Sequence, residues 1–215
     1  MADALARPRP DALPARTQPD PSRRRDPERY DAGALLFAPG PAEDVLYLVS
    51  GLVRLHALDE DGGGLTLRYV KPGGWFGEEA MARRPRSLFA EAVTEVEVLH
   101  VPLPALSARD RAAVAEHLAD ALDGVYRALA RLARRPLRAR VAAELLDLSD
   151  SALATRDGDR IAVRITHDAL ADSVGSVRET VTKVIGELSR AGAVDAGYGR
   201  VVVRDADRLR ELAGG

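Results

Sequence analysis

The sequence predicts an α+β protein, in which a first part made of short antiparallel strands precedes a second part made mainly of helices. Between residues 33 and 102, short apolar runs with β-branched or aromatic members alternate with glycine-containing stretches, a pattern typical of antiparallel sheets. From residue 107 onward the apolar residues follow helical spacing instead. The chain has 215 residues, of which 46% are apolar, so it can bury one large core or two small ones.

Residues 1–29 predict a disordered arm that precedes the first strand. The segment is rich in proline and charged residues, a composition that cannot bury enough apolar surface to pack. It lacks the apolar core of a signal peptide, and no apolar run in the chain approaches the roughly 20 residues of a membrane span. Because the sequence has no cysteine, disulfides, thiolate metal sites and a cysteine nucleophile are excluded. We expect a cytoplasmic protein with no membrane partner.

Residues 30–106 predict a barrel or sandwich of antiparallel strands. The stretches APGPAED, DEDGGG and KPGGW separate the strand candidates. Each stretch contains glycine, which adopts the positive φ angles that tight hairpin connections require. The candidates, in chain order, are ALLF, VLYLVSG, LVRLHAL, LTLRYV and VEVLHVP. Many short strands at this spacing are typical of closed or double-layered antiparallel folds.

Residues 107–135 predict one long helix that pairs with a second copy of the chain. Its apolar residues recur at intervals of four and three, which is the spacing of a coiled-coil seam. The seam residues are Val114, Leu118, Ala121, Val125, Ala128 and Leu132. The small side chains of Ala121 and Ala128 permit two helices to approach closely, so we expect a homodimer. The alternative is that the helix packs on its own barrel, a role that suits Leu122 and Leu129 on the adjacent flank.

Residues 136–215 predict a winged helix-turn-helix domain. Pro136 ends or kinks the preceding helix. The following segments are typical, in order, of a helix, a short strand, a helix, a tight turn, a helix and a hairpin around Gly-Tyr-Gly. Thr166 suits the N-cap of the first helix of the pair, and Gly175 suits the sharp turn. This order is that of a helix-turn-helix followed by a wing.

The second helix of the pair, predicted from Ser176 to Ala191, divides into an apolar stripe and a polar face. The stripe, expected to face inward, comprises Val177, Val181, Val184, Ile185 and Leu188. The polar face lies in the first turns, where a recognition helix presents side chains to the major groove. It comprises Arg178, Glu179, Thr182 and Lys183. The alternative is that Ser176 and Glu179 form a capping box and that the other charges are solvated.

The charge of this domain does not by itself indicate DNA binding. From Val141 to Gly215 there are 10 basic and 13 acidic residues, whereas a DNA-binding domain is typically basic. Only the stretch from Arg127 to Arg140, with six arginines and no acidic residue, is strongly positive. The pattern alone therefore leaves a nucleic-acid-binding helix and an ordinary amphipathic helix as alternatives.

Four segments of the chain resemble a known family. They are GALLFAPGPAEDVLYLVSGLVRL, VKPGGWFGEEA, RSLFAEA and ITHDALADSVGSVRETVTKVIGELSRAG. The first three resemble the cyclic-nucleotide-binding jelly roll, and the last the helix-turn-helix, of the cyclic-AMP receptor protein/FNR superfamily of bacterial transcription regulators. The resemblance implies a homodimeric, sequence-specific regulator that binds double-stranded DNA. The run GSVRETVTKVIGEL also resembles a branch of the superfamily that serves stress responses.

The resemblance implies a set of DNA contacts. Arg178, Glu179 and Lys183 fall on the three base-reading positions of the family's recognition helix. Arginine suits guanine O6 and N7, and glutamate accepts a hydrogen bond from cytosine N4, so the resemblance implies a TGTGA-like half-site in a palindrome. His167 replaces an arginine that contacts the DNA backbone, which implies a weaker contact at that place. Phosphate contacts are implied for Ser176, Thr180 and the wing residue Arg200.

The resemblance also implies an effector cassette. The family uses a glutamate for the ribose hydroxyl of a cyclic nucleotide and an Arg-Ser pair for its phosphate, and Glu78, Arg86 and Ser87 match these in order. The cassette is shorter than in the receptor protein, and Val125 and Tyr126 replace a Thr-Ser pair that faces the adenine. Three alternatives stay open. The pocket binds cyclic AMP, it is vestigial with Glu78 and Arg86 paired to each other, or it binds another small ligand.

No catalytic or metal site is predicted. The four histidines are scattered singly, at positions 56, 100, 117 and 167, whereas a cupin-type metal site needs two or three converging histidines with a carboxylate. Phosphate-binding loops and nucleophile motifs are also absent. We therefore expect a protein that is not an enzyme. By the resemblance, the loop from Ala154 to Arg160 lies where the receptor protein meets RNA polymerase, which implies transcription activation.

Overall fold

The computed structural model describes residues 26–59, 63–158 and 160–214. Most of the arm predicted for residues 1–29 lies outside the described residues. Glu28 and Arg29, however, belong to the first strand, which pairs with the last strand of the first domain. That domain therefore begins slightly before the boundary predicted at Tyr30. No helix in the described part of the chain has the length and apolarity that a membrane crossing needs.

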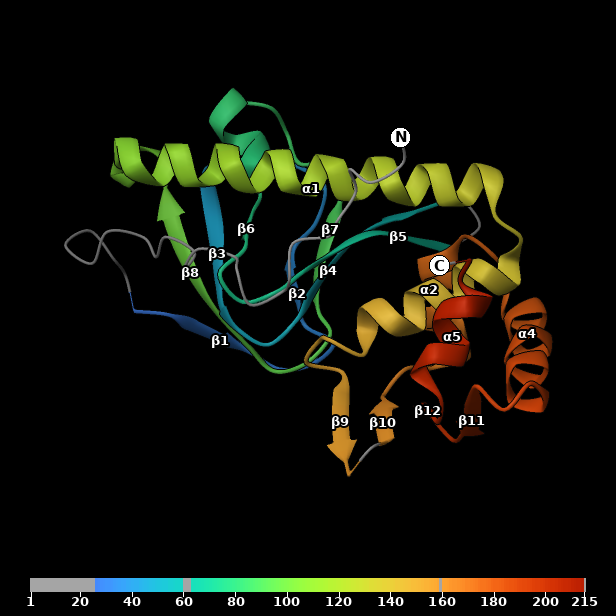
Figure 1. Cartoon of the computed structure of the whole chain (residues 1–215). Coiled ribbons are helices and arrows are strands. Elements are labelled where there is room, and N and C mark those ends of the chain that lie inside the picture. Colours follow the sequence, from blue (N-terminus) through green and yellow to red (C-terminus); the bar gives the residue numbers. More distant parts are fainter. Residues whose placement is uncertain (1–25, 60–62, 159, 215) are drawn as a thin grey trace, which may run out of the picture.

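Two four-stranded antiparallel sheets form the first domain, a β-roll (Figure 1). Their strand orders are β1-β8-β3-β6 and β2-β7-β4-β5. Alternate strand residues point inward, so that Leu46, Leu48, Val53, Leu55 and Phe76 are buried between the sheets. The strands are β1 (Glu28–Tyr30), β2 (Leu35–Phe37), β3 (Asp44–Ser50), β4 (Val53–Leu58), β5 (Gly64–Val70), β6 (Trp75–Phe76), β7 (Phe89–Ala92) and β8 (Val96–Pro102).

A long helix, α1 (Ala108–Arg134), follows the roll and reaches the second domain (Figure 1). The Ser107 side chain accepts a hydrogen bond from the Asp110 N–H, and the Asp110 carboxylate accepts one from the Ser107 N–H. This capping box fixes the start of the helix. α1 passes close over the roll, since a Cβ added to Gly74 would lie 3.2 Å from Cε1 of His117.

The apolar face that α1 exposes differs from the predicted seam. Val114 is buried within its own chain, and Ala121 and Ala128 are half-buried. Leu122 and Leu129, which the alternative interpretation placed against the roll, are 46% and 60% exposed. The exposed seam consists of Leu118, Leu122, Val125, Leu129 and Leu132. It keeps the alternating spacing of four and three and three of the predicted members, with Leu122 and Leu129 in place of Ala121 and Ala128.

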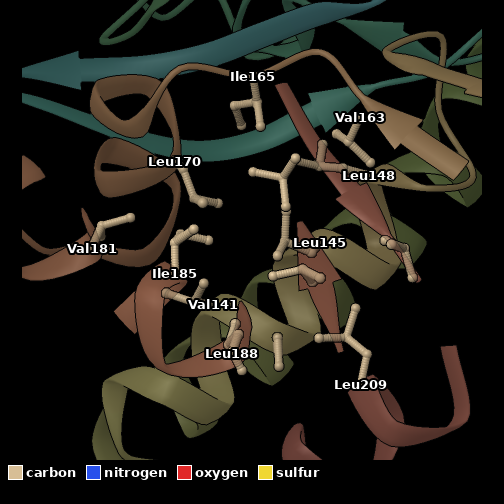
Figure 2. Close-up of a cluster of buried hydrophobic side chains, with 14 of the residues drawn as sticks. Val141, Leu145, Leu148, Val163, Ile165, Leu170, Val181, Ile185, Leu188 and Leu209 are labelled. Carbon is tan, nitrogen blue, oxygen red and sulfur yellow. The ribbon is translucent and has the colours of Figure 1, made fainter. Parts of the chain in front are cut away.

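The second domain has the predicted winged helix-turn-helix order. Its four strands form one antiparallel sheet in the order β11-β12-β10-β9. Figure 2 shows its apolar core, where Leu145, Leu170, Ile185, Leu188 and Leu209 converge. The last of these lies on a C-terminal helix that the sequence pattern did not predict. The elements are α2 (Leu137–Leu148), β9 (Ala154–Asp157), β10 (Arg160–Val163), α3 (His167–Val174), α4 (Arg178–Arg190), β11 (Val194–Gly197), β12 (Arg200–Val203) and α5 (Ala206–Leu212).

The turn between β3 and β4 joins the two domains. Gly51 adopts a φ of +86°, and a Cβ there would lie 2.2 Å from the carbonyl oxygen of Glu95, so only glycine fits. The Leu52 N–H donates to Oγ1 of Thr94 at 3.0 Å. Leu52 itself is fully buried and belongs to the core of the second domain. The roll therefore contributes a residue to the core of the helix-turn-helix domain.

Polar contacts from β4 and β5 also connect the roll to α3. Arg54 bridges Glu91 of the roll and Asp172 of α3, with nitrogen to oxygen distances of 2.9 and 3.4 Å. The hydroxyl of Tyr69 lies 2.8 Å from Oγ of Ser173. These contacts hold the first helix of the helix-turn-helix against the roll.

Glu144 of α2 lies beside this junction and has a raised pKa. Burial raises the pKa of this carboxyl group to about 7, and the like charge of Asp147 adds to the effect. Arg131 of α1, the Ser173 hydroxyl and Lys71 act in the opposite direction. Ionisation of Glu144 therefore opposes the packed arrangement.

Candidate nucleic-acid interface and effector cassette

Thr166 and Gly175 set the geometry of the helix-turn-helix, as the sequence predicts. Oγ1 of Thr166 accepts a hydrogen bond from the N–H of Ala169 at 3.1 Å and caps α3. Gly175 ends α3 with a φ of +61°, and its N–H donates to the carbonyl of Ala171. Both predictions are confirmed.

The start of α4 differs from the prediction in two ways. The N-cap is Val177 and no side chain caps this helix, so the capping box expected between Ser176 and Glu179 is wrong. The Ser176 N–H instead donates to the carbonyl of Ala171 at 3.0 Å, because this residue still belongs to the turn. Val177, expected to face inward, is 60% exposed, whereas the other four residues of the apolar stripe are buried.

Helix α4 presents one polar face to the outside of the domain. The four residues predicted for it are exposed. They occupy positions i, i+1, i+4 and i+5, which share one side of a helix. The opposite side packs into the core, and α4 lies at the outer edge of the domain (Figure 1). We call Arg178, Glu179, Thr182 and Lys183 the reading face.

Two contacts connect the reading face to the first turn of α3. Nη1 of Arg178 lies 3.2 Å from Oδ2 of Asp168. The Thr182 hydroxyl donates to the carbonyl of Arg178 at 2.9 Å and lies 2.8 Å from Nδ1 of His167. His167 and Thr182, both predicted to contact DNA, therefore contact each other. The pattern gave no signal for Asp168, because its partner lies across the turn.

The three residues predicted to contact phosphates flank the reading face. Ser176 is half-buried in the turn before α4, and Thr180 is exposed in the first turn of α4. Arg200 is exposed at the start of β12, where the wing begins its return strand. The wing is braced by an ion pair between Arg204 and Asp195 at 3.2 Å. These positions permit backbone contacts on either side of an inserted α4.

In the effector cassette, Arg86 is already engaged by other groups of the chain. Its Nη2 lies 2.5 Å from Oδ1 of Asp44 and donates to the Asp44 carbonyl at 3.0 Å. Its guanidinium carbon lies 4.1 Å from the centre of the Phe37 ring. The side chains of Arg86 and Asp44 are only 10% and 22% exposed. Arg86 thus already has an anionic partner within the chain.

A chain of hydrogen bonds holds Asp44 in this position. Its second oxygen, Oδ2, lies 2.6 Å from Nδ1 of His100, and Nε2 of His100 lies 2.9 Å from the Tyr30 hydroxyl. Although burial acts to raise it, the hydrogen bonds from His100 and Arg86 keep the pKa of Asp44 below its ordinary value. Asp44 is therefore ionised at neutral pH and neutralises Arg86.

A second cassette residue, Glu78, also has a partner within the chain. Both carboxylate oxygens of Glu78 accept from Arg68 at 2.9 Å, so the expected pair between Glu78 and Arg86 is wrong. Glu78 pairs with Arg68 of β5 and Arg86 with Asp44 of β3, and the local spacing of the cassette does not predict either partner. Ser87 is exposed. Tyr126 is 60% exposed on α1, next to the seam.

The described residues contain no group of three or more potential ligands that would hold a metal ion. His56 is buried and stacks on Phe89 at 5.4 Å between ring centres. Burial lowers its pKa, so it is neutral at physiological pH. His56 and His100 are therefore structural groups of the roll, and His167 belongs to the helix-turn-helix.

A roll with a cyclic-nucleotide-type cassette and an outward recognition helix together define a DNA-binding transcription regulator. Comparison with known families agrees with this class. The cyclic nucleotide-binding domain family matches residues 27–108, and the Crp-like helix-turn-helix domain family matches residues 139–212. The chain belongs to the CRP/FNR superfamily of transcriptional regulators, which confirms the resemblance and the predicted fold class.

Individual relatives extend over nearly the whole chain. Transcriptional regulator SdrP of Thermus thermophilus is 45% identical over 193 residues, which are 88% of this chain and 95% of that protein. A crystal structure of a CRP/FNR-family transcriptional regulator from the same species superposes with a TM-score of 0.85 at 43% identity, covering 88% of this chain and 99% of the other. A CRP-like cAMP-activated global transcriptional regulator of Mycobacterium tuberculosis is 31% identical over 199 residues, 87% of this chain and 88% of that protein.

Proposed function

We propose that this protein is a cytoplasmic regulator that binds a TGTGA-like palindrome as a homodimer and needs no small effector. The observation that carries the DNA-binding part is the reading face of α4. Its arginine, glutamate and lysine are exposed, and the contacts to α3 hold Arg178 and Thr182 in place. Arg178 then pairs with a guanine and Glu179 with a cytosine.

The dimer part of the proposal rests on the exposed seam of α1. Five large apolar side chains line one stripe of the helix and are exposed in the described chain, and a stripe of this spacing pairs with a copy of itself. A two-fold axis along the seam would relate two reading faces, which then enter successive major grooves about 34 Å apart. The palindrome follows from this symmetry.

The effector-independent part rests on the cassette. A cyclic phosphate needs an unpaired arginine, and Asp44 already supplies a negative charge to Arg86. A ribose hydroxyl needs a free carboxylate, and Glu78 is held by Arg68. The internal pairs therefore fill the roles that the nucleotide plays in a ligand-activated regulator.

A cyclic-AMP-dependent regulator is the second candidate. It is favoured by the domain match over residues 27–108 and by the buried Nε of Arg86, which has no hydrogen-bond partner within the described chain. For this candidate a cyclic nucleotide has to displace Asp44 from Arg86. The metal-dependent enzyme considered from the sequence has no supporting observation.

The regulatory role that we propose is activation of transcription at stress-responsive promoters. The segment from Ala154 to Arg160, on β9 and the start of β10, would meet RNA polymerase, and the resemblance of the α4 segment to stress-response regulators suggests the kind of promoter.

Arg178→Ala tests the reading face, with Arg190→Ala at the other end of α4 as the matched control. Fluorescence anisotropy at one fixed salt concentration compares a labelled TGTGA palindrome with the same duplex after the guanine is changed. Arg178→Ala should lose about 1–3 kcal/mol on the palindrome and no longer distinguish the two duplexes. Arg190→Ala should bind like the wild type. An equal loss on both duplexes for Arg178→Ala would exclude a base contact.

A further inference from the structure

Val177 has two properties that its structural position does not explain. It is 60% exposed, although the other apolar residues of the α4 stripe are buried. It also occupies the N-cap of α4 without capping it. Valine is among the least favourable N-cap residues, because it has no oxygen to accept a hydrogen bond from the first turn. A serine or aspartate here would stabilise the helix, so the position is not optimised for folding.

The surroundings of Val177 point to DNA as the group that covers it. Its neighbour Arg178 begins the reading face, and Thr180 and Glu179 are exposed in the same first turn of α4. Local departures from stability rules are typical of functional sites. Among the groups on a major-groove edge, the one that suits an exposed branched aliphatic side chain is the 5-methyl group of thymine.

We propose that Val177 is a specificity-determining residue that contacts the methyl group of a thymine beside the guanine paired with Arg178. This inference rests on the proposed binding of a TGTGA-like palindrome. The TGTGA half-site contains thymines on both strands, so several thymine methyl groups are candidates for the contact with Val177. A serine at this position would instead offer a hydrogen bond to a phosphate, which carries no base information.

Deoxyuridine differs from thymidine only by the absent methyl group, so it isolates this contact. Deoxyuridine replaces one thymine of the TGTGA palindrome at a time, symmetrically in both half-sites, and anisotropy at fixed salt measures the affinity. At one position the wild type should lose about fourfold per half-site, as expected for one buried methyl-sized group. Val177→Ala should bind the thymine duplex more weakly by a similar factor and should not respond to deoxyuridine at that position.

Val177→Ser separates a base contact from a structural role. It should also lose the response to deoxyuridine, yet its unfolding temperature should rise, because serine caps α4. A purely structural valine would not combine higher stability with lower thymine discrimination. The inference is overturned if deoxyuridine is neutral at every position in the wild type, or if Val177→Ala weakens thymine and deoxyuridine duplexes equally. If the wild type does not prefer the palindrome to a scrambled duplex, the proposed function itself fails.

Discussion

Replacing Asp44 by alanine removes the counter-ion of Arg86 and leaves a mostly buried guanidinium without its charge partner. Breaking a fully buried ion pair costs about 3–5 kcal/mol, whereas an exposed pair contributes about 0–1 kcal/mol. The Arg86 and Asp44 side chains are 10% and 22% exposed, so we expect an intermediate loss of about 2–3 kcal/mol in the free energy of unfolding. Urea unfolding at neutral pH measures this loss.

Two control variants isolate the charge effect. Glu97→Ala removes one partner of the pair with Arg29, whose side chain is 76% exposed, and should cost less than about 1 kcal/mol. Asp44→Asn keeps the shape of the side chain and removes its charge. Because the pKa of Asp44 is below its ordinary value, its stabilising effect is present at neutral pH and disappears in acid. The wild type and Asp44→Asn should therefore converge in stability as the pH falls through that pKa.

The same variants report on the cassette. Cyclic AMP should leave the unfolding temperature of the wild type unchanged, because Arg86 is engaged. In Asp44→Ala the guanidinium is open to a phosphate, so cyclic AMP should raise the unfolding temperature progressively with ligand concentration. Asp44 does not act as the counter-ion of Arg86 if Asp44→Ala is as stable as Glu97→Ala. It does not block the cassette if cyclic AMP stabilises the wild type as much as the variant.

Three further predictions concern the dimer, the domain junction and the turn. Leu129→Glu should give monomers in sedimentation velocity, because like charges would face each other across the seam. The control Ala130→Glu, on the solvent side of α1, should remain dimeric, and a dimeric Leu129→Glu would mean that the seam is misassigned. The wild type should lose up to about 3 kcal/mol of stability as the pH rises from 4.5 through 7, since folding raises the pKa of Glu144. In urea unfolding, Glu144→Gln should show a smaller change of stability with pH, and the same change as in the wild type would contradict this role of Glu144. Gly175→Ala should cost about 1–2 kcal/mol in urea unfolding, because φ is +61° there, and an unchanged midpoint would exclude strain at the turn.

Local signals in the sequence predicted much of the fold. Glycine-containing separators marked where strands of the roll end, although only DEDGGG joins two paired strands, β4 and β5, whereas APGPAED and KPGGW connect the two sheets. Thr166 and Gly175 marked the cap and the turn of the helix-turn-helix. These signals work because hydrogen bonds and φ angles within a few residues decide such features. The position of the reading face also followed from helical spacing, since Val181 and Ile185 are buried behind it.

Features set by contacts between distant segments could not be predicted in this way. Which apolar residues of α1 stay exposed depends on how the helix packs in the folded chain, where Ala121 and Ala128 are half-buried and Leu122 and Leu129 are exposed. The partner of Arg86 is 42 residues away in the sequence, and no periodic pattern connects it to Asp44. Val177 was assigned to the core because it is apolar, whereas its exposure depends on where the turn after Gly175 ends.

Recognition of the palindrome without an effector can be tested in a single titration. Fluorescence anisotropy at fixed salt compares a labelled TGTGA palindrome with a scrambled duplex, each with and without cyclic AMP. We expect the protein alone to prefer the palindrome by about a thousandfold or more, and cyclic AMP to leave this preference unchanged. Preference for the palindrome that arises only when cyclic AMP is present would contradict recognition without an effector and would mean that the nucleotide displaces Asp44 from Arg86.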